Sequence, residues 1–305
     1  MSAGWTAASV RAGGLARQRL GAGRCRDLAA QHSLAAAVTL LRATVYARFL
    51  APGASLEDAA HGTRAAVLWE LRVLAGWLPP SGARLARALA AGFERDNIAG
   101  HAARLSGRPA PPAFELGTLA TAWPRLRQAG STVELETELA HTVWASAPRG
   151  LPLRDRLTLA WLRRLDAVAP AVRPWHELAV VTLMAKTWLF EGTAPPPAFR
   201  EEAARLVGSR WETAHSIDEL REALPPAPRR ILAEVTASDE LWRAEAALWH
   251  RIEDDAFAWV RSPREGPETI LGSIALLASD ARRVRAALAS AAAGGLVEEV
   301  FDVVA

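Results

Sequence analysis

Apolar residues recur along much of the chain at intervals of three and four, which places their side chains on one face of an α-helix. The first clear run lies between residues 33 and 50 and consists of Leu34, Val38, Leu41, Val45 and Phe49. The sequence APGA ends this run, so the pattern predicts one amphipathic helix there. No segment alternates apolar and polar residues with β-branched enrichment, and the fold class is therefore predicted to be all-α.

Two further helices follow from capping signals and breaks. One is predicted to begin at Ser55, because Asp58 follows it at the spacing of a capping box, and to end at the Pro79-Pro80 pair. The next is predicted to run from about residue 84 to residue 105. It carries a polar Asp96-Asn97 pair in line with its apolar face, so Asn97 is expected to be buried and to need hydrogen-bond partners.

Matching segments suggest an internal repeat. Shifting the chain by 85 residues aligns PPAF at 111–114 with PPAF at 196–199, and STVELETEL at 131–139 with SIDELREAL at 216–224. Both longer segments have Ser followed by Glu three residues later, so each is predicted to start a capped helix after a similar connection. A weaker third copy, SDARRVRAALASAAAGG, spans 279–295.

These matches predict how the chain is organised. A single domain over 1–305 is expected, built from approximate repeats at 1–110, 111–195 and 196–305, each close to the size of a small domain. In this alignment Thr182 takes the place of Asn97 in the second copy, and Arg283 takes it in the third.

Charge does not favour nucleic acid as a partner. The 36 basic residues, all arginine except Lys186, are interleaved with 33 acidic ones, which leaves a net charge of +3. No block of five like charges occurs, whereas a nucleic-acid-binding protein gathers its bases on one face or in one tail. Half of the residues are hydrophobic, an ordinary composition for a soluble protein.

Nothing at the N-terminus resembles an apolar leader, and the single Cys25 forms no disulfide within the chain, so a cytoplasmic location is expected. The longest apolar stretch, 178–190, is interrupted by Lys186 and is shorter than the roughly 20 residues that cross a bilayer. If the protein acts at a membrane, it is therefore predicted to do so without crossing the bilayer.

Familiar catalytic patterns are missing. The seven histidines are dispersed without metal-site spacing, and Lys186 does not follow a Gly-rich loop, which excludes a nucleotide-hydrolase phosphate loop. Cys25 lies between two arginines without an identifiable base and is predicted to be a partly exposed thiol. No catalytic residue, metal or cofactor is predicted.

Two alternatives remain open. The segment EDDAFAWVR at 253–261 resembles the aspartate-rich magnesium motif of an all-α terpene synthase through Asp254 and Asp255, but Ala258 stands where another acid is needed, so a solvated helix turn is preferred. The second alternative is that the chain is a helical-repeat scaffold of an unrelated complex. The twelve tryptophans are interpreted mainly as core residues, although Trp242, Trp249 and Trp259 form a possible docking stripe.

Four segments in order, SVRAGGLARQRL, LLRATVYARFL, FERDNIAGHAARL and SDARRVRAALASAAAGGLVEEV, resemble the stalk-socket subunit of rotary V-type and archaeal-type ATPases. This family has prokaryotic and eukaryotic members. The resemblance spans nearly the whole chain. It implies partner-binding or inter-repeat seam residues at Arg11, Tyr46 with Thr44, Asp96 and Asn97 with Ile98, Asp280 and Arg283.

The resemblance implies a funnel of three similar helical subdomains without catalytic residues. Such a subunit receives the tip of the central shaft and sits on the membrane rotor ring, and it couples ATP chemistry to proton or sodium transport. Its membrane contact is indirect, on the inner face, and it has no small-molecule substrate. Thr182 and Arg283 depart from the Asn of the family pattern, which argues against one shared polar mechanism at all three seams.

Overall fold

A computed structural model describes residues 3–295 of the chain, and within them the regular structure is helical, without strands. The predicted all-α class is confirmed. The last of the four segments that resemble the socket family ends in LVEEV at 296–300. These residues lie outside the described part of the chain.

The described chain forms two compact units. Unit 1 holds the chain up to Thr121 and again from Glu253 onward, and unit 2 holds residues 122–252. The main helices of unit 1 are α1 (Ala3–Arg17), α2 (Gly21–Ala29), α3 (Leu34–Leu41), α4 (Leu56–Trp77), α5 (Ala83–Leu105) and α14 (Pro267–Ala292). Helix α13 (Leu241–Arg261) begins in unit 2 and ends in unit 1.

Unit 2 is made of shorter helices. They are α6 (Trp123–Leu126), α7 (Thr132–Leu139), α8 (Leu153–Val168), α9 (Arg173–Met184), α10 (Pro197–Val207), α11 (Ile217–Ala223) and α12 (Pro226–Arg229). A π-helical segment, Ala185–Phe190, continues α9. Short 3-10 segments, such as Ala47–Phe49 in unit 1 and Arg210–Thr213 in unit 2, connect several of these helices.

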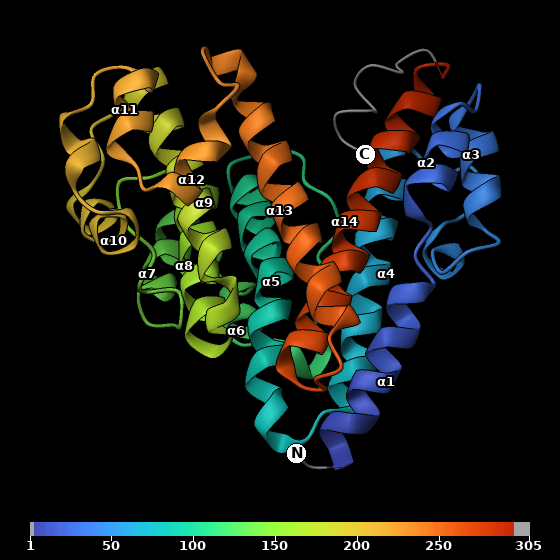
Figure 1. The fold of residues 1–305 in the computed structure, drawn as a ribbon. Coiled ribbons are helices and arrows are strands. Elements are labelled where there is room, and N and C mark those ends of the chain that lie inside the picture. The colour runs from blue at the N-terminus through green and yellow to red at the C-terminus, as the bar shows by residue number, and fades with distance from the viewer. Residues whose placement is uncertain (1–2, 296–305) are drawn as a thin grey trace. The chain divides into compact units, whose positions relative to one another are not determined.

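Helix α14 is the central helix of unit 1. It packs against α1, α2, α3 and α4, and Figure 1 shows it running alongside α4. Eighteen of its 26 residues are buried, many of them Ala, Ser or Gly, and small side chains let neighbouring backbones come close. At Gly272 an added Cβ would lie 2.8 Å from the Ala256 carbonyl oxygen of α13, so only glycine fits without a shift.

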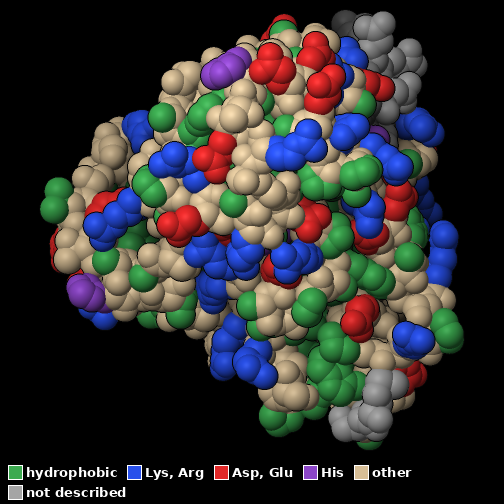
Figure 2. Space-filling view, turned by 60° about the vertical axis from the view of Figure 1, so that its left-hand side comes forward, with side chains coloured by type: hydrophobic (Ala, Val, Ile, Leu, Met, Phe, Trp, Pro, Cys, Tyr) green, Lys and Arg blue, Asp and Glu red, His purple; other side chains and the backbone are tan. Residues whose placement is uncertain are grey.

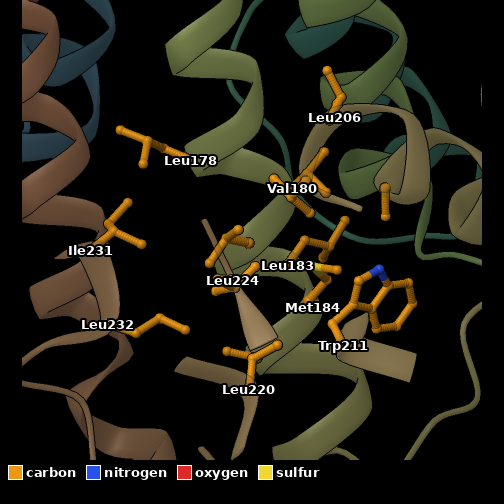
Figure 3. Close-up of a cluster of buried hydrophobic side chains, with 14 of the residues drawn as sticks. Leu178, Val180, Leu183, Met184, Leu206, Trp211, Leu220, Leu224, Ile231 and Leu232 are labelled. Carbon is orange, nitrogen blue, oxygen red and sulfur yellow. The ribbon is translucent and has the colours of Figure 1, made fainter. Parts of the chain in front are cut away.

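The core of unit 2 is formed largely by α9 and the segments that follow it (Figure 3). Trp211 is 1% exposed, and its ring meets those of Trp188 and Phe199 edge-on, with centroids 5.7 and 6.4 Å away. The other labelled side chains of this cluster are Leu178, Val180, Leu183, Met184, Leu206, Leu220, Leu224, Ile231 and Leu232. Each fully buried leucine contributes roughly 1.5–3 kcal/mol.

Two of the three helices predicted in unit 1 are found. Helix α4 begins at Leu56, and the Ser55 hydroxyl accepts a hydrogen bond from the Asp58 amide at 3.1 Å, as the capping-box spacing predicted. Helix α5 spans Ala83–Leu105, close to the predicted bounds.

The helix predicted between residues 33 and 50 is wrong in length, because α3 ends at Leu41. The Thr44 hydroxyl donates to the Leu41 carbonyl at 2.6 Å and accepts from the Tyr46 amide at 3.3 Å. A threonine side chain that takes both roles competes with the helical backbone hydrogen bonds and turns the chain. The 3-to-4 spacing of apolar residues continues through the turn, since Tyr46 and Leu50 are also buried.

The capped helix starts at Ser131 and Ser216 are confirmed. Each hydroxyl accepts from the amide of the Glu three residues later, at 3.1 Å for Glu134 and 3.2 Å for Glu219. Each Glu carboxylate in turn accepts, at 2.8 Å, from the amide four residues before it.

The matching proline-rich segments, by contrast, adopt different structures. PPAF at 111–114 lies outside the helices, whereas at 196–199 it opens α10, although Phe114 and Phe199 are both buried. The predicted similarity of the two connections is therefore wrong at these prolines. Proline is tolerated both in an extended segment and in the first turn of a helix, so the shared letters did not distinguish the two structures.

Candidate functional site

Two of the predicted site residues, Tyr46 and Asp280, meet in a buried cluster in unit 1. The Asp280 side chain of α14 accepts hydrogen bonds from the amides of Leu20 and Gly21 at 2.9 and 2.7 Å, at the start of α2. It also accepts one from the Tyr46 hydroxyl at 2.7 Å. Asp280 is fully buried, and a carboxylate with three donors at a helix N-terminus is well stabilised. These contacts join α14 to α2 and to the turn after α3.

Burial at this cluster changes the acid–base properties of its neighbours. It raises the pKa of Tyr46, and the negative charge of Asp280 raises it further, so the hydroxyl stays protonated and donates. Burial, with a further contribution from Asp280 and against the opposing charge of Arg283, raises the pKa of Cys25 to about 12. The prediction of a partly exposed thiol at Cys25 is wrong, because this side chain of α2 is fully buried.

Arg283, one turn after Asp280, points to a different partner. Its guanidinium donates to both carboxylate oxygens of Glu253 in α13, with Nη1 2.6 Å from Oε1. Glu253 raises the Arg283 pKa, and Arg283 is only 9% exposed, so the pair links two long helices inside unit 1. Where the family pattern has an Asn, this chain therefore has a buried ion pair.

Asn97 of α5 holds the connection that follows its own helix. Its Nδ2 donates to the Phe114 carbonyl at 2.9 Å, and its Oδ1 accepts from the Phe114 amide at 2.6 Å. Asn97 is 2% exposed, and both polar groups of its amide are used. The buried amide therefore has the hydrogen bonds that it needs, and these bonds fix the segment around Phe114 against α5.

Neighbouring acidic residues of α5 have their own partners. Asp96 accepts from Arg95 Nε at 2.9 Å and forms an ion pair with Arg64 of α4. Glu94 is 1% exposed and accepts from both the amide and the hydroxyl of Thr121, the amide at 2.7 Å. Because Asp96 and Asn97 point to different partners, the adjacent pair does not act as one polar site.

Arg11 lies apart from these clusters. It is exposed on α1. Burial raises the pKa of Glu70 of α4, and the charge of Arg11 only partly opposes this shift. In unit 2, Thr182 donates within α9 to the Leu178 carbonyl at 3.0 Å and makes no contact comparable to that of Asn97. Binding of partners by Arg11, Tyr46, Asp96, Asn97, Asp280 and Arg283 stays a prediction.

The predicted repeat, at a shift of 85 residues, does not include a second recurrence that lies 98 residues apart. TVYA at 44–47 and TVWA at 142–145 share three letters. The Thr142 hydroxyl donates to the Leu139 carbonyl at 2.9 Å and accepts from the Trp144 amide at 3.2 Å, as Thr44 does with Leu41 and Tyr46. Tyr46 and Trp144 are each 1% exposed, and both turns follow a helix capped by Ser, α3 after Ser33 and α7 after Ser131.

Unit 2 contains a buried polar cluster that the sequence did not indicate. The Glu202 side chain of α10 is 1% exposed and accepts from Arg163 of α8 at 2.9 and 2.5 Å. His176 of α9 is fully buried, with Nε2 3.0 Å from Glu202 Oε1 and Nδ1 3.6 Å from Asp166 Oδ2. Burial by itself raises the Glu202 pKa, but His176 and Arg163 outweigh it and hold that pKa below its ordinary value.

The described part of the chain contains no candidate metal-binding cluster and no candidate membrane-spanning helix. No group of three or more His, Cys, Asp or Glu side chains there is placed to hold a metal ion, and Asp254 lies exposed on α13. None of the described helices combines the length and apolar character needed to span a membrane. Figure 2 shows acidic side chains among the basic ones on the face in view.

Comparison with protein-family models finds none that matches this chain, and comparison with curated protein sequences gives no match either.

Proposed function

We propose that the chain is a non-catalytic central-stalk subunit of a rotary V-type or archaeal-type ATPase. It couples the rotating shaft to the membrane rotor ring for proton or sodium transport, and its partners are proteins of that complex. In this proposal three helical repeats surround a socket for the shaft, and the subunit is peripheral on the inner face of the membrane. The proposal rests on the sequence resemblance together with the local geometry of the residues that carry it.

The recurring Thr-x-aromatic turn is the observation that carries the proposal. The Thr-x-Tyr motif named in the resemblance forms a specific turn at Thr44 and Tyr46, and the same hydrogen bonds recur at Thr142 and Trp144. Each turn ends a helix capped by Ser. Two copies of the same turn, each with a buried aromatic ring, support descent from a duplicated helical unit. Repeated helical units are what the resemblance to the socket family implies.

Buried carboxylates give independent support. Asp280 of α14 accepts from the amides of Leu20 and Gly21, and Glu94 of α5 accepts from the amide of Thr121. In both cases a buried acid on a long helix accepts hydrogen bonds from backbone amides just before or at the start of a short helix. That helix is α2 for Asp280 and α6 for Glu94. With Val284 aligned to Ile98, Glu94 and Asp280 occupy equivalent positions, which fits the repeat on which the proposal depends.

Co-purification tests the proposal. The tagged full chain is co-expressed with the shaft and rotor-ring subunits encoded by the same genome and is purified at low and at high salt. A stoichiometric complex with the shaft is expected, and a complex lost at high salt would indicate that charge complementarity holds it. The matched control is the same chain expressed with the shaft subunit of an unrelated rotary enzyme.

Failure to bind shaft or ring under either condition would contradict the proposal. Gene order provides a second check: genes for nucleotide-binding, shaft and ring subunits beside this gene are expected. A neighbouring prenyl-diphosphate pathway would instead favour the terpene-synthase interpretation of Asp254 and Asp255. Binding of an unrelated complex with no rotary subunit would favour a general helical scaffold.

A further inference from the structure

Trp69 of α4 lies against two arginine side chains in unit 1. The guanidinium carbon of Arg48 is 3.7 Å from the centroid of the indole ring, and that of Arg72 is 5.7 Å from it. A guanidinium group is attracted by the negative π-face of tryptophan, so the ring holds both cations at one place. Both arginines are exposed, whereas Trp69 is partly buried. The two charges are therefore presented to the surroundings of the protein.

Neither arginine forms an ion pair with an acidic side chain among the residues that the structure describes. Elsewhere in unit 1 a guanidinium group does have such a partner, as Arg283 has in Glu253. Two like charges close to one ring repel each other, and no described carboxylate offsets that repulsion. The surface at Trp69 thus has positive charge without a counter-ion from the described chain.

The Arg72 side chain is fixed by the backbone of the segment after α5. Its Nη1 donates to the Glu115 carbonyl at 3.2 Å. Gly117, with a φ of +55°, lies so close that an added Cβ would be 3.2 Å from Arg72 Nη2. Glycine therefore lets the guanidinium group lie against the backbone. The bond to Glu115 uses one N–H group, and the others remain available to a partner.

The backbone that carries Arg48 is fixed in a similar way. The 3-10 segment Ala47–Phe49 packs on α4 at Gly62, where an added Cβ would collide with the Phe49 carbonyl oxygen. From this segment the Arg48 guanidinium group reaches over Trp69, two turns farther along α4. Both cations are therefore held in place before a partner arrives, which reduces the conformational entropy lost on binding.

We propose that Arg48, Trp69 and Arg72 form a docking site for an acidic segment of a protein. Tryptophan and arginine are enriched at interface hot spots, and a guanidinium group binds a carboxylate through two parallel hydrogen bonds. The two positive charges are complementary to the carboxylates of such a segment. The inference does not depend on the rotary-ATPase proposal.

Other anionic partners fit this surface less well. Single-stranded nucleic acid stacks its bases on aromatic rings, whereas the Arg48 guanidinium group already lies over the indole ring of Trp69. Duplex nucleic acid and anionic membranes are bound by a wide field of basic residues, and this site has only Arg48 and Arg72. Carboxylates on a peptide need no more than the guanidinium groups that are present.

Fluorine NMR of the full chain labelled with 5-fluorotryptophan tests the site, with a hexaglutamate peptide as the probe at low salt. The Trp69→Phe variant assigns the Trp69 signal. This signal is expected to move as the peptide is added, and a hexalysine peptide should leave it in place because its charge is of the wrong sign. Absence of binding would overturn the proposal, and so would movement of other tryptophan signals alone.

Calorimetric titration measures what each arginine contributes. The affinity for hexaglutamate should fall about tenfold in Arg48→Gln and in Arg72→Gln, as the loss of a charge-assisted hydrogen bond does. Arg72→Lys keeps the charge without the fork and should fall between the two, and it keeps the proposal testable if a Gln variant does not fold. Arg87→Gln removes an exposed arginine of α5 and is the matched control, with unchanged affinity.

The melting temperature separates docking from a structural role. Arg48 and Arg72 are surface residues, so both Gln variants should melt close to the unchanged chain while they bind the peptide less. A large loss of melting temperature with unchanged affinity of the folded protein would show a structural role and overturn the proposal. Displacement of the peptide by an equal concentration of inorganic phosphate would also overturn it, because it would indicate a phosphate site.

Discussion

The Tyr46 hydroxyl donates a 2.7 Å hydrogen bond to Asp280, a residue 234 positions away in sequence. This bond ties the turn after α3 to the central helix of unit 1. Since both groups are buried, the Asp280 charge relies on Tyr46 and on the amides of Leu20 and Gly21 for its stabilisation. The first prediction follows from that dependence.

Tyr46→Phe removes one charge-assisted hydrogen bond and should lower the free energy of unfolding by roughly 1.5–3 kcal/mol. Asp280→Asn should cost more, because an amide group cannot accept from three donors without facing one of them with its own N–H groups. Urea unfolding measures both changes. The double variant should lose less than the sum of the two, whereas strict additivity would show that the bond contributes nothing; Asp27→Asn, exposed on α2, is the control.

Asn97→Leu should lower the melting temperature, because it leaves the amide and the carbonyl of Phe114 buried without partners. Each unsatisfied group costs about 1–3 kcal/mol. Differential scanning calorimetry checks this, with Gln128→Leu, an exposed amide on the surface, as the comparison. Unchanged stability combined with weaker binding of the shaft would instead favour a role of Asn97 in the socket.

The free energy of unfolding should decrease at acidic pH, because Glu202 becomes protonated. The Glu202 pKa lies below its ordinary value of 4.5, so its contribution is fully present above that value and is lost as the pH falls through the lowered pKa. The urea midpoint, followed by tryptophan fluorescence from pH 7 to pH 3, should therefore decline less steeply in Glu202→Gln. Glu201→Gln removes an exposed acid next to it and should keep the slope of the unchanged chain. Equal slopes for all three proteins would contradict the role of Glu202.

Cys25 should react with a thiol reagent only after the protein opens. Its side chain is fully buried, and its pKa of about 12 leaves almost no thiolate at neutral pH. Reaction with a disulfide reagent at pH 8 should be slow in the native protein and immediate in denaturant. A rapid native reaction would show that α2 separates readily from α14, and Cys25→Ala provides the blank.

The fold class and the capped helix starts follow from the sequence because they depend on local spacing. An acidic residue three positions after a serine predicted a capped helix start in three places. The structure shows the cap at each of them, Ser55, Ser131 and Ser216. The end of α3 did not follow, since the Thr44 turn continues the helical apolar period while Tyr46 is drawn to a partner far along the chain.

The site could be predicted in part. Burial of Asn97 followed from its position four residues after Phe93, but its partner did not, because a backbone group outside the helices has no sequence signature. Arg283 and Glu253 are 30 residues apart on different helices, and only the packing of α13 against α14 brings them together. The buried position of Cys25 was hidden for the same reason, since the arginines on both sides of it suggested an exposed helix face.

Two glycines of α4 provide the last prediction, because they share a helix and differ in surroundings. An added Cβ at Gly62 would collide with the Phe49 carbonyl of the segment after α3, whereas Gly76 has nothing within 4 Å. Gly62→Ala should therefore destabilise the protein by about 1–3 kcal/mol through overpacking. Gly76→Ala should stabilise it by roughly 0.5–1 kcal/mol, the gain in helix propensity. Opposite shifts of the thermal midpoint are expected, and a stabilising Gly62→Ala would mean that the turn after α3 does not pack against α4 in solution.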